Sequence, residues 1–239
     1  MSLSNLTEVG QGARVAVQLQ AHNYSVKRIH RGKSQHMLYK FYIIMYQPRL
    51  ELIMAKTASS MIALGTVAPD FNLPEPATGK TRDLQSMRGA RGTMIMFICN
   101  HCPFVKFVAH ELARLGQDYM PRDIAVVAIN ANDVIAYPDD APDKMVVEAR
   151  QQGYTFPYLY DQSQQVAKAY QAACTPDFYL YDADLKCVYR GQLDDARPSN
   201  GIAVTGRDLR AAIEALLTGE AVAHEQRPSI GCGIKWKTT

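Results

Sequence analysis

The stretch FICNHCPFV, residues 97–105, holds two cysteines, Cys99 and Cys102, with two residues between them. The run TMIMFIC (93–99) that leads into it is short and apolar, which is typical of a buried strand. Pro103 suits the first position of a helix, because its φ is fixed and its missing N–H is not needed there. The stretch therefore predicts a cysteine pair between a buried strand and a helix.

A cysteine pair at this position is suited to disulfide exchange. The first turn of a helix has unpaired N–H groups and the positive end of the helix dipole, and both favour a thiolate. Since the thiolate is the nucleophile, Cys99 is predicted to attack a disulfide and Cys102 to resolve the mixed disulfide. A partly positive His101 beside the pair would stabilise the thiolate further. We therefore predict catalytic roles for Cys99, Cys102 and His101.

The composition is that of a globular protein, with 239 residues of which 47% are hydrophobic and 21% are charged. No apolar run reaches the length of a membrane span, and FYIIMY (41–46) is too short for one. Residues 61–239 carry 18 Lys and Arg against 21 Asp and Glu, so charge does not support nucleic-acid binding. Five cysteines with this spacing do not indicate a disulfide scaffold. We expect a cytoplasmic protein whose cysteine pair is catalytic or metal-binding.

Residues 1–60 differ from the rest of the chain. They carry 8 Lys and Arg against 2 Asp and Glu and show little apolar periodicity, so we expect poor order. Met54 offers a second plausible start, and our favoured hypothesis is that residues 1–53 are a non-native upstream extension. The alternative is a basic targeting segment or a partner-binding arm. The domain is predicted over residues 61–239, including a tail at 220–239.

The region after the cysteine pair alternates strands with helices. Together with the first strand and helix it gives the order β-α-β-α-β-β-α, which predicts an α/β fold with a mixed central sheet and helices on both faces. The further strands are expected at residues 123–133, 178–182 and 186–191, and the further helices at 141–152, 163–173 and 205–218.

A strand, a cysteine pair, a helix and then a Thr-Pro dipeptide before a hairpin resemble the thioredoxin fold. The opening APDFNLP (68–74) resembles the start of the redoxins, the alkyl hydroperoxide reductase and thiol-specific antioxidant (AhpC/TSA) branch. The run from about residue 62 to 239 is similar to a bacterial peroxiredoxin-like group of thioredoxin-family proteins. The motifs that recur there in this order are FICNHCP, AIN, YPDD, FPYLYD, CTPDF, RGQLDD, VTGRDLRAA and PSIGCGIKWK. The resemblance implies a thioredoxin fold with an N-terminal redoxin-type extension.

Several site residues follow from this resemblance. It implies that Pro176 has a cis peptide bond and faces the cysteine pair, and that the backbone of Thr175 binds an extended substrate. It also places Cys174 near the pair and makes Cys232, in the tail, a candidate mobile fourth thiol. The implied activity is a thiol-dependent oxidoreductase, antioxidant or disulfide-exchanging, that acts on a disulfide or dithiol protein without a cofactor or a metal.

The sequence also departs from its relatives. A peroxiredoxin carries Pro and Thr seven and three residues before its reactive cysteine, and neither Cys99 nor Cys102 has them. The peroxiredoxin arginine before the hairpin strand is missing as well, so a peroxide would be less well polarised here. The tryptophan that precedes a thioredoxin cysteine pair is Ile98, and the buried carboxylate of thioredoxins is Thr93. No proton-transfer partner for Cys102 is identified.

Three other functions stay open at this point. The first is a peroxiredoxin-like thiol peroxidase that reduces hydroperoxides. The second is a metal-binding or docking module, in which Cys99, His101 and Cys102 would offer zinc-type ligands together with Cys174 or Cys232. The third is a structural protein, because cysteine is among the most buried residue types. The sequence does not predict the physiological substrate, the electron donor or the oligomeric state.

Overall fold

The structure is a computed structural model that describes residues 56–238. The predictions for residues 1–55 lie outside the described residues. The described part opens with β1 (Lys56–Ala58), so the last residues of the segment 1–60 already include a strand. None of the helices in residues 56–238 is both long enough and apolar enough to cross a membrane.

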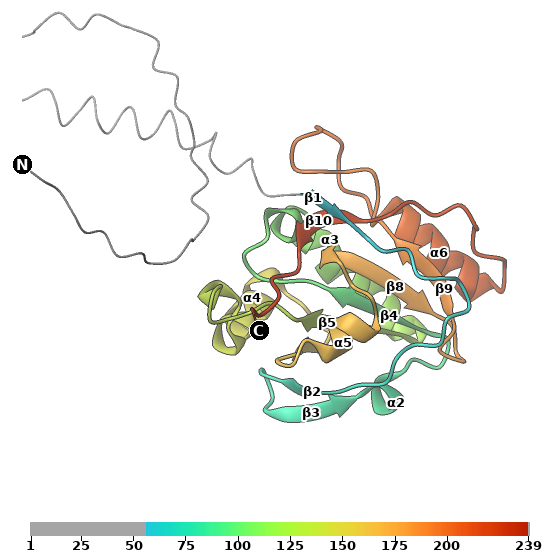
Figure 1. Ribbon diagram of the computed structural model, residues 1–239. Helices are drawn as coiled ribbons and strands as arrows, with labels where there is room; N and C mark the ends of the chain where they lie inside the picture. Colours follow the sequence, from blue (N-terminus) through green and yellow to red (C-terminus); the bar gives the residue numbers. More distant parts are fainter. Residues whose placement is uncertain (1–55, 239) are drawn as a thin grey trace, which may run out of the picture. The chain divides into compact units, whose positions relative to one another are not determined.

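A mixed five-stranded sheet forms the centre of the described part (Figure 1). Strand β4 lies in the middle, parallel to β5 on one side and antiparallel to β8 on the other. Strand β6 extends the parallel half, and β9 forms a hairpin with β8. This arrangement confirms the predicted thioredoxin fold. The strands are β4 (Gly92–Phe97), β5 (Ile124–Asn130), β6 (Tyr158–Tyr160), β8 (Asp177–Tyr181) and β9 (Cys187–Gly191).

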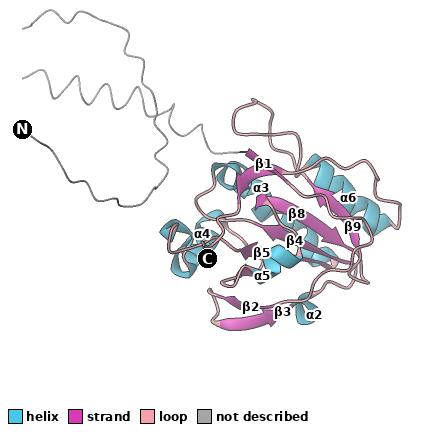
Figure 2. Ribbon diagram, viewed as in Figure 1, coloured by secondary structure: helices cyan, strands magenta, loops and turns pink. Residues whose placement is uncertain are grey.

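Helices cover both faces of this sheet, as predicted (Figure 2). Side chains alternate along a strand, so Met94 and Met96 enter one buried cluster while Ile95 and Phe97 enter the other. The first cluster packs against α3 (Pro103–Tyr119), α4 (Pro142–Gln152) and α6 (Arg207–Thr218). The second packs against α2 (Leu84–Met87), α5 (Gln165–Ala169) and the hairpin of β2 (Asn72–Glu75) and β3 (Lys80–Asp83).

A small antiparallel sheet joins the two ends of the described chain. Its order is β1-β10-β7, with β10 at Ile230–Gly233 and β7 at Cys174–Thr175. Within it Cys232 lies opposite Thr175. Cys232 is only 1% exposed, so it sits in a paired, buried strand rather than in the mobile tail that the sequence suggested. The tail also contacts α5 through Trp236, whose ring lies 5.8 Å from the Lys168 ammonium.

Other differences from the sequence-based elements have local causes. The helix expected at 163–173 shortens to α5 because Gln164 and Gln171 have φ of 62° and 53°, outside the right-handed helical region. The strand expected at 123–133 ends at Asn130, and the residues after it form a loop. That loop leads to the short helix Pro138–Asp140, and a similar turn at Met120–Arg122 follows α3. Helix α4 ends at Gly153, whose left-handed φ of 71° suits a helix C-terminus.

Gly231 is required by the close approach of β10 to β7. A Cβ at this position would lie 2.0 Å from the Thr175 carbonyl oxygen, which is fixed backbone. We therefore expect Gly231→Ala to lower the free energy of unfolding by about 3 kcal/mol. Gly233→Ala is the matched control, because its Cβ would meet only the Thr57 side chain at 3.0 Å, which can rotate. Urea unfolding measures both variants, and equal losses would contradict this account of β10.

Asp177, directly after Pro176, is a fully buried carboxyl group. It accepts hydrogen bonds from the Ser59 hydroxyl (2.8 Å) and the Ala173 amide (3.2 Å). Burial nevertheless raises its pKa from 3.8 to about 6. The folded protein therefore binds a proton more tightly than the unfolded chain, and this contribution to stability is lost as the pH rises from about 4 to about 6.

We expect this titration to appear when the wild type is compared with Asp177→Asn. The stability of the wild type relative to the variant falls by about 3 kcal/mol between pH 4 and pH 7, because the pKa shift is about two units. Urea unfolding at several pH values measures the free energy of unfolding of both proteins. In the difference between them, the contributions of all other carboxylates cancel. A difference that stays constant with pH would show that Asp177 does not titrate in this range.

Candidate active site

The cysteine pair lies where β4 ends and α3 begins. Pro103 is the first residue of α3, as the sequence predicted, and Cys102 is the N-cap of that helix. Both cysteines are free thiols, with 2% of Cys99 and none of Cys102 exposed. The pair therefore sits at a helix N-terminus but below the surface.

Thr175 faces the cysteine pair, and the peptide bond that joins it to Pro176 is cis. Its hydroxyl oxygen lies 3.3 Å from the Cys99 sulfur, and its carbonyl oxygen lies 3.2 Å from the Cys102 sulfur. The structure thus brings together the predicted residues Cys99, Cys102, Thr175 and Pro176. The backbone of Thr175 is already paired with Cys232 of β10, so an extended partner cannot pair there while β10 is in place.

The two thiols differ in their tendency to ionise. Burial raises the pKa of Cys99 well above its usual range, and the neighbouring Cys102 and Asp140 act in the same direction. The neighbouring thiols of Cys232 and Cys99 lower the pKa of Cys102, and the amide of Val105 in the first turn of α3 adds to this. The negative charge of the pair is therefore favoured at Cys102, whereas helix position alone had suggested Cys99.

Asp140 holds the loop between the cysteines in place. Its carboxylate is fully buried and accepts hydrogen bonds from the backbone amides of Asn100 (2.8 Å) and His101 (3.2 Å). It also accepts from the Asn132 side chain (2.8 Å) and contacts Nδ1 of His101 (2.6 Å). The Asn130 side chain donates to its backbone carbonyl oxygen (2.9 Å). Asp140 is thus bonded to both residues that separate Cys99 from Cys102.

Sequence reasoning did not assign a role to Asp140. Its motif, YPDD, was noted only as one of the recurring stretches. The structure shows why it matters: β4 and β5 are parallel neighbours, and the loops at their carboxyl ends meet at one edge of the sheet. The polar run after Asn130 and the segment up to Asp140 therefore lie near the cysteine loop, a placement that the sequence analysis did not make.

His101 is oriented by two neighbours. Its Nδ1 faces the Asp140 carboxylate, and its ring stacks on Tyr137 with centroids 5.3 Å apart. With the proton on Nδ1, a neutral imidazole carries its lone pair on Nε2. Nε2 is buried without a hydrogen-bond partner among the described residues. His101 therefore has an uncommitted polar atom, Nε2, beside the cysteine loop.

Cys99, His101 and Asp140 are also a candidate metal-ligand set, since one ligand atom from each lies within 4.8 Å of the others. The carboxylate is already engaged by four donors, among them both amides of the cysteine loop. A metal bound by Asp140 and Nδ1 of His101 would displace the contact between them. The donor set is therefore better explained as a hydrogen-bonded anchor for the loop.

The remaining cysteines divide into one that faces the pair and two that do not. Residues directly opposite in an antiparallel pair project to the same side, so Cys232 projects to the side of Thr175 that carries the reactive cysteines. Cys174, one residue away, projects to the other side and contacts the Pro176 carbonyl oxygen at 3.5 Å. Cys187 lies in the other buried cluster, as expected for a structural residue.

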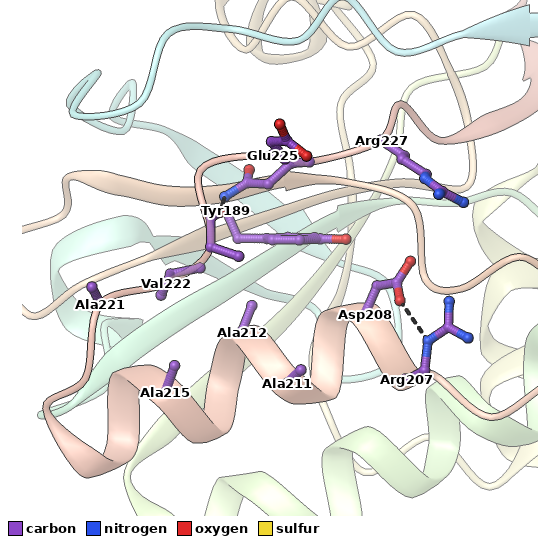
Figure 3. Close-up of a pocket in the computed structure, with 12 residues that line it drawn as sticks. Tyr189, Arg207, Asp208, Ala211, Ala212, Ala215, Ala221, Val222, Glu225 and Arg227 are labelled. Carbon is purple, nitrogen blue, oxygen red and sulfur yellow. Dashed lines mark hydrogen bonds and ion pairs between the residues drawn. The ribbon is translucent and has the colours of Figure 1, made fainter.

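Hollows in the described part of the chain also lie outside the cysteine pair. A cavity of about 400 Å³ lies between α6, the Tyr189 ring and the segment 221–227 (Figure 3), and it includes none of the predicted site residues. A much smaller one, about 20 Å³, is bordered by Pro176 together with Phe104 and Phe107 of α3. The second hollow therefore adjoins the cis-proline loop and is mainly apolar on that side.

Known proteins resemble this chain at the levels of sequence and structure. A curated relative, thiol-disulfide oxidoreductase ResA of Geobacillus thermodenitrificans (strain NG80-2), is 27% identical over 132 residues, which cover 54% of this chain and 70% of ResA. A crystal structure of an uncharacterized conserved protein from Geobacillus kaustophilus is 57% identical, with a TM-score of 0.77 over 79% of this chain and all of that one. A hypothetical protein from Sinorhizobium meliloti 1021 is 50% identical, with a TM-score of 0.75 over 77% of this chain and all of that one.

The comparison with protein families covers the part of the chain that contains both the sheet and the cysteine pair. Residues 64–190 match the AhpC/TSA family. This range runs from the segment before β2 to the end of the β8–β9 hairpin and includes Cys99, Cys102, Asp140 and Thr175. Because the match covers more than half of the chain, the chain belongs to the AhpC/TSA family of redoxins.

Proposed function

We propose that the protein is a thiol–disulfide oxidoreductase in which Cys99 and Cys102 alternate between a dithiol and a disulfide. The observation that carries this proposal is the contact of both sulfurs with Thr175, opposite a cis-proline at the N-terminus of α3. The family and the similarity to ResA support a redox role of this kind. The substrate would be a disulfide-containing or dithiol protein.

The first step is attack by Cys99 on a disulfide of the partner. The Cys102 thiolate takes the proton of Cys99, and the Thr175 carbonyl oxygen, 3.2 Å from the Cys102 sulfur, then accepts a hydrogen bond from the new S–H. The Cys99 thiolate forms a bond to one sulfur of the partner. The partner's second sulfur leaves as a thiolate and takes up a proton from the solvent.

The second step releases the partner. Cys102 gives its proton to the partner sulfur that leaves and attacks the sulfur of Cys99, which forms the Cys99–Cys102 disulfide and breaks the mixed disulfide. The partner leaves as a dithiol that has gained two electrons from the cysteine pair and two protons, one from the pair and one from the solvent. The same steps in reverse oxidise a partner dithiol, so an external dithiol or disulfide closes the cycle in either direction.

The peroxidase alternative has less support from the site. Among residues 56–238, no arginine side chain hydrogen-bonds to the sulfur of Cys99 or Cys102, whose oxygen partners belong to Thr175. A peroxide bound at Cys99 would therefore lack a positive group that stabilises the leaving oxygen. Peroxidase activity and a cytoplasmic location both stay predictions.

We expect Cys99→Ser to abolish the reduction of insulin disulfides by the dithiothreitol-reduced protein, because the attacking sulfur is removed. Cys102→Ser keeps the attacking sulfur but loses the thiolate that takes its proton and the whole second step, so it forms a mixed disulfide with the partner more slowly and retains it. Cys187→Ser is the matched control, since Cys187 is buried in the cluster on the other face of the sheet. Insulin turbidity and non-reducing mass spectrometry measure these outcomes. Full activity of Cys99→Ser would refute the proposal.

Asp140 provides a separate test of how the pair is positioned. Asp140→Asn replaces an acceptor oxygen with an NH₂ group that faces buried donors, so we expect a loss of about 3 kcal/mol in the free energy of unfolding. Displacement of the cysteine loop should also lower the rate of insulin reduction about tenfold or more. Activity is compared at a temperature at which both proteins are folded.

The control for this variant is Asp139→Asn. Asp139 is the exposed neighbour of Asp140, and only its backbone carbonyl oxygen contacts the site, through the Asn100 side chain. We expect it to retain both stability and activity. Equal behaviour of the two variants would show that the buried carboxylate does not position the pair.

A further inference from the structure

The tail strand β10 occupies the place at Thr175 where an extended partner was expected. It pairs antiparallel with β7, and Cys232 lies directly opposite Thr175. The approach is close enough to exclude a Cβ at Gly231, next to Cys232. The chain therefore presents one of its own cysteines at the position that the fold offers to a partner strand.

Cys232 also projects toward the reactive pair. It shares a side of the small sheet with the Thr175 side chain, whose hydroxyl contacts the Cys99 sulfur. It is 1% exposed and belongs to the same buried cluster as Cys99 and Cys102. The carbonyl oxygen of Thr175 contacts the Cys102 sulfur at 3.2 Å, so the residue opposite Cys232 touches both reactive cysteines. Three cysteines, Cys99, Cys102 and Cys232, therefore gather around Thr175.

We propose that Cys232 is a third redox thiol, which exchanges with the Cys99–Cys102 disulfide to form a Cys102–Cys232 disulfide. In this step the Cys232 sulfur attacks the Cys102 sulfur, the Cys99–Cys102 bond breaks, and Cys99 is released as a thiol. Cys232 loses one proton and Cys99 gains one, so the exchange needs no external oxidant or reductant. The inference rests on the proposed function and extends it to an internal partner.

The exchange would return Cys99 to its reduced form while the two oxidising equivalents stay in the protein. Cys99 could then attack a second disulfide before the first pair of electrons is replaced. The oxidised tail would at the same time be covalently tied to the N-terminus of α3. Cys174 cannot serve this role without a change of strand register, because it projects to the opposite side of β7.

The Cys99→Ser variant isolates the proposed bond. The purified full chain is equilibrated with glutathione and glutathione disulfide, alkylated and mapped by mass spectrometry under non-reducing conditions. We expect a peptide pair joined through Cys102 and Cys232, with the loss of two hydrogens from the intact mass, while glutathione disulfide is reduced to two glutathione molecules. Cys99→Ala is the second variant, in case the serine variant does not fold.

The matched pair of double variants gives the control. Adding Cys174→Ser to Cys99→Ser should leave the linkage in place, whereas adding Cys232→Ser should abolish it and leave Cys102 free or bound to glutathione. A Cys99→Ser protein that is folded by circular dichroism but forms no Cys102–Cys232 linkage would overturn the inference. A linkage between Cys102 and Cys174 would overturn it equally.

Failure of this inference can be told apart from failure of the proposed function. If the linkage forms but the wild type does not reduce insulin, the role of Cys232 is supported and the proposed oxidoreductase activity is refuted. If the wild type and Cys232→Ser reduce insulin at the same rate, and Cys99→Ser forms no linkage, the activity is supported and the role of Cys232 is refuted.

Discussion

The site depends on the way that Thr175 is held between two parts of the chain. Its hydroxyl contacts Cys99, its carbonyl oxygen contacts Cys102, and its backbone is paired with Cys232. Directly after these contacts and the cis bond to Pro176, the chain enters β8, which pairs with the central strand β4. One residue therefore fixes the spacing of three sulfurs relative to a rigid strand. A change in its backbone position would alter all three contacts together.

The second constraint is the buried carboxylate of Asp140. A buried charge is costly unless it is fully hydrogen-bonded, and here four donors from two segments, the cysteine loop and the loop after β5, supply the bonds. Two of these donors are consecutive backbone amides of the cysteine loop, so the carboxylate selects the conformation of that loop. His101 is held by the same group, which links the orientation of the imidazole to the geometry of the sulfurs. The Asp140 carboxylate thus positions both the cysteine loop and the imidazole beside it.

The sequence was sufficient where the pattern was long or chemically distinctive. The cysteine pair, Pro103 and the apolar runs of β4, β5, β8 and β9 predicted the sheet and the start of α3. Short strands such as β6 and β7 have too few residues for a periodicity, and β10 contains two glycines and a cysteine, so no pattern marks it. Asp140 could not be found because its role comes from donors distant in sequence. The ionisation of Cys102 likewise depends on Cys232, which lies 130 positions further along.

The order β1-β10-β7 has a consequence for the use of fragments of this protein. β10 is a central strand only because β1, at the opposite end of the described chain, pairs with its outer side. Without β1 it becomes an edge strand that is attached to the domain through a two-residue ladder. A piece of the protein that spans only the family match, residues 64–190, lacks both strands. Such a piece would retain the cysteine pair but uncover it, and its reactivity would describe an open site rather than that of the intact domain.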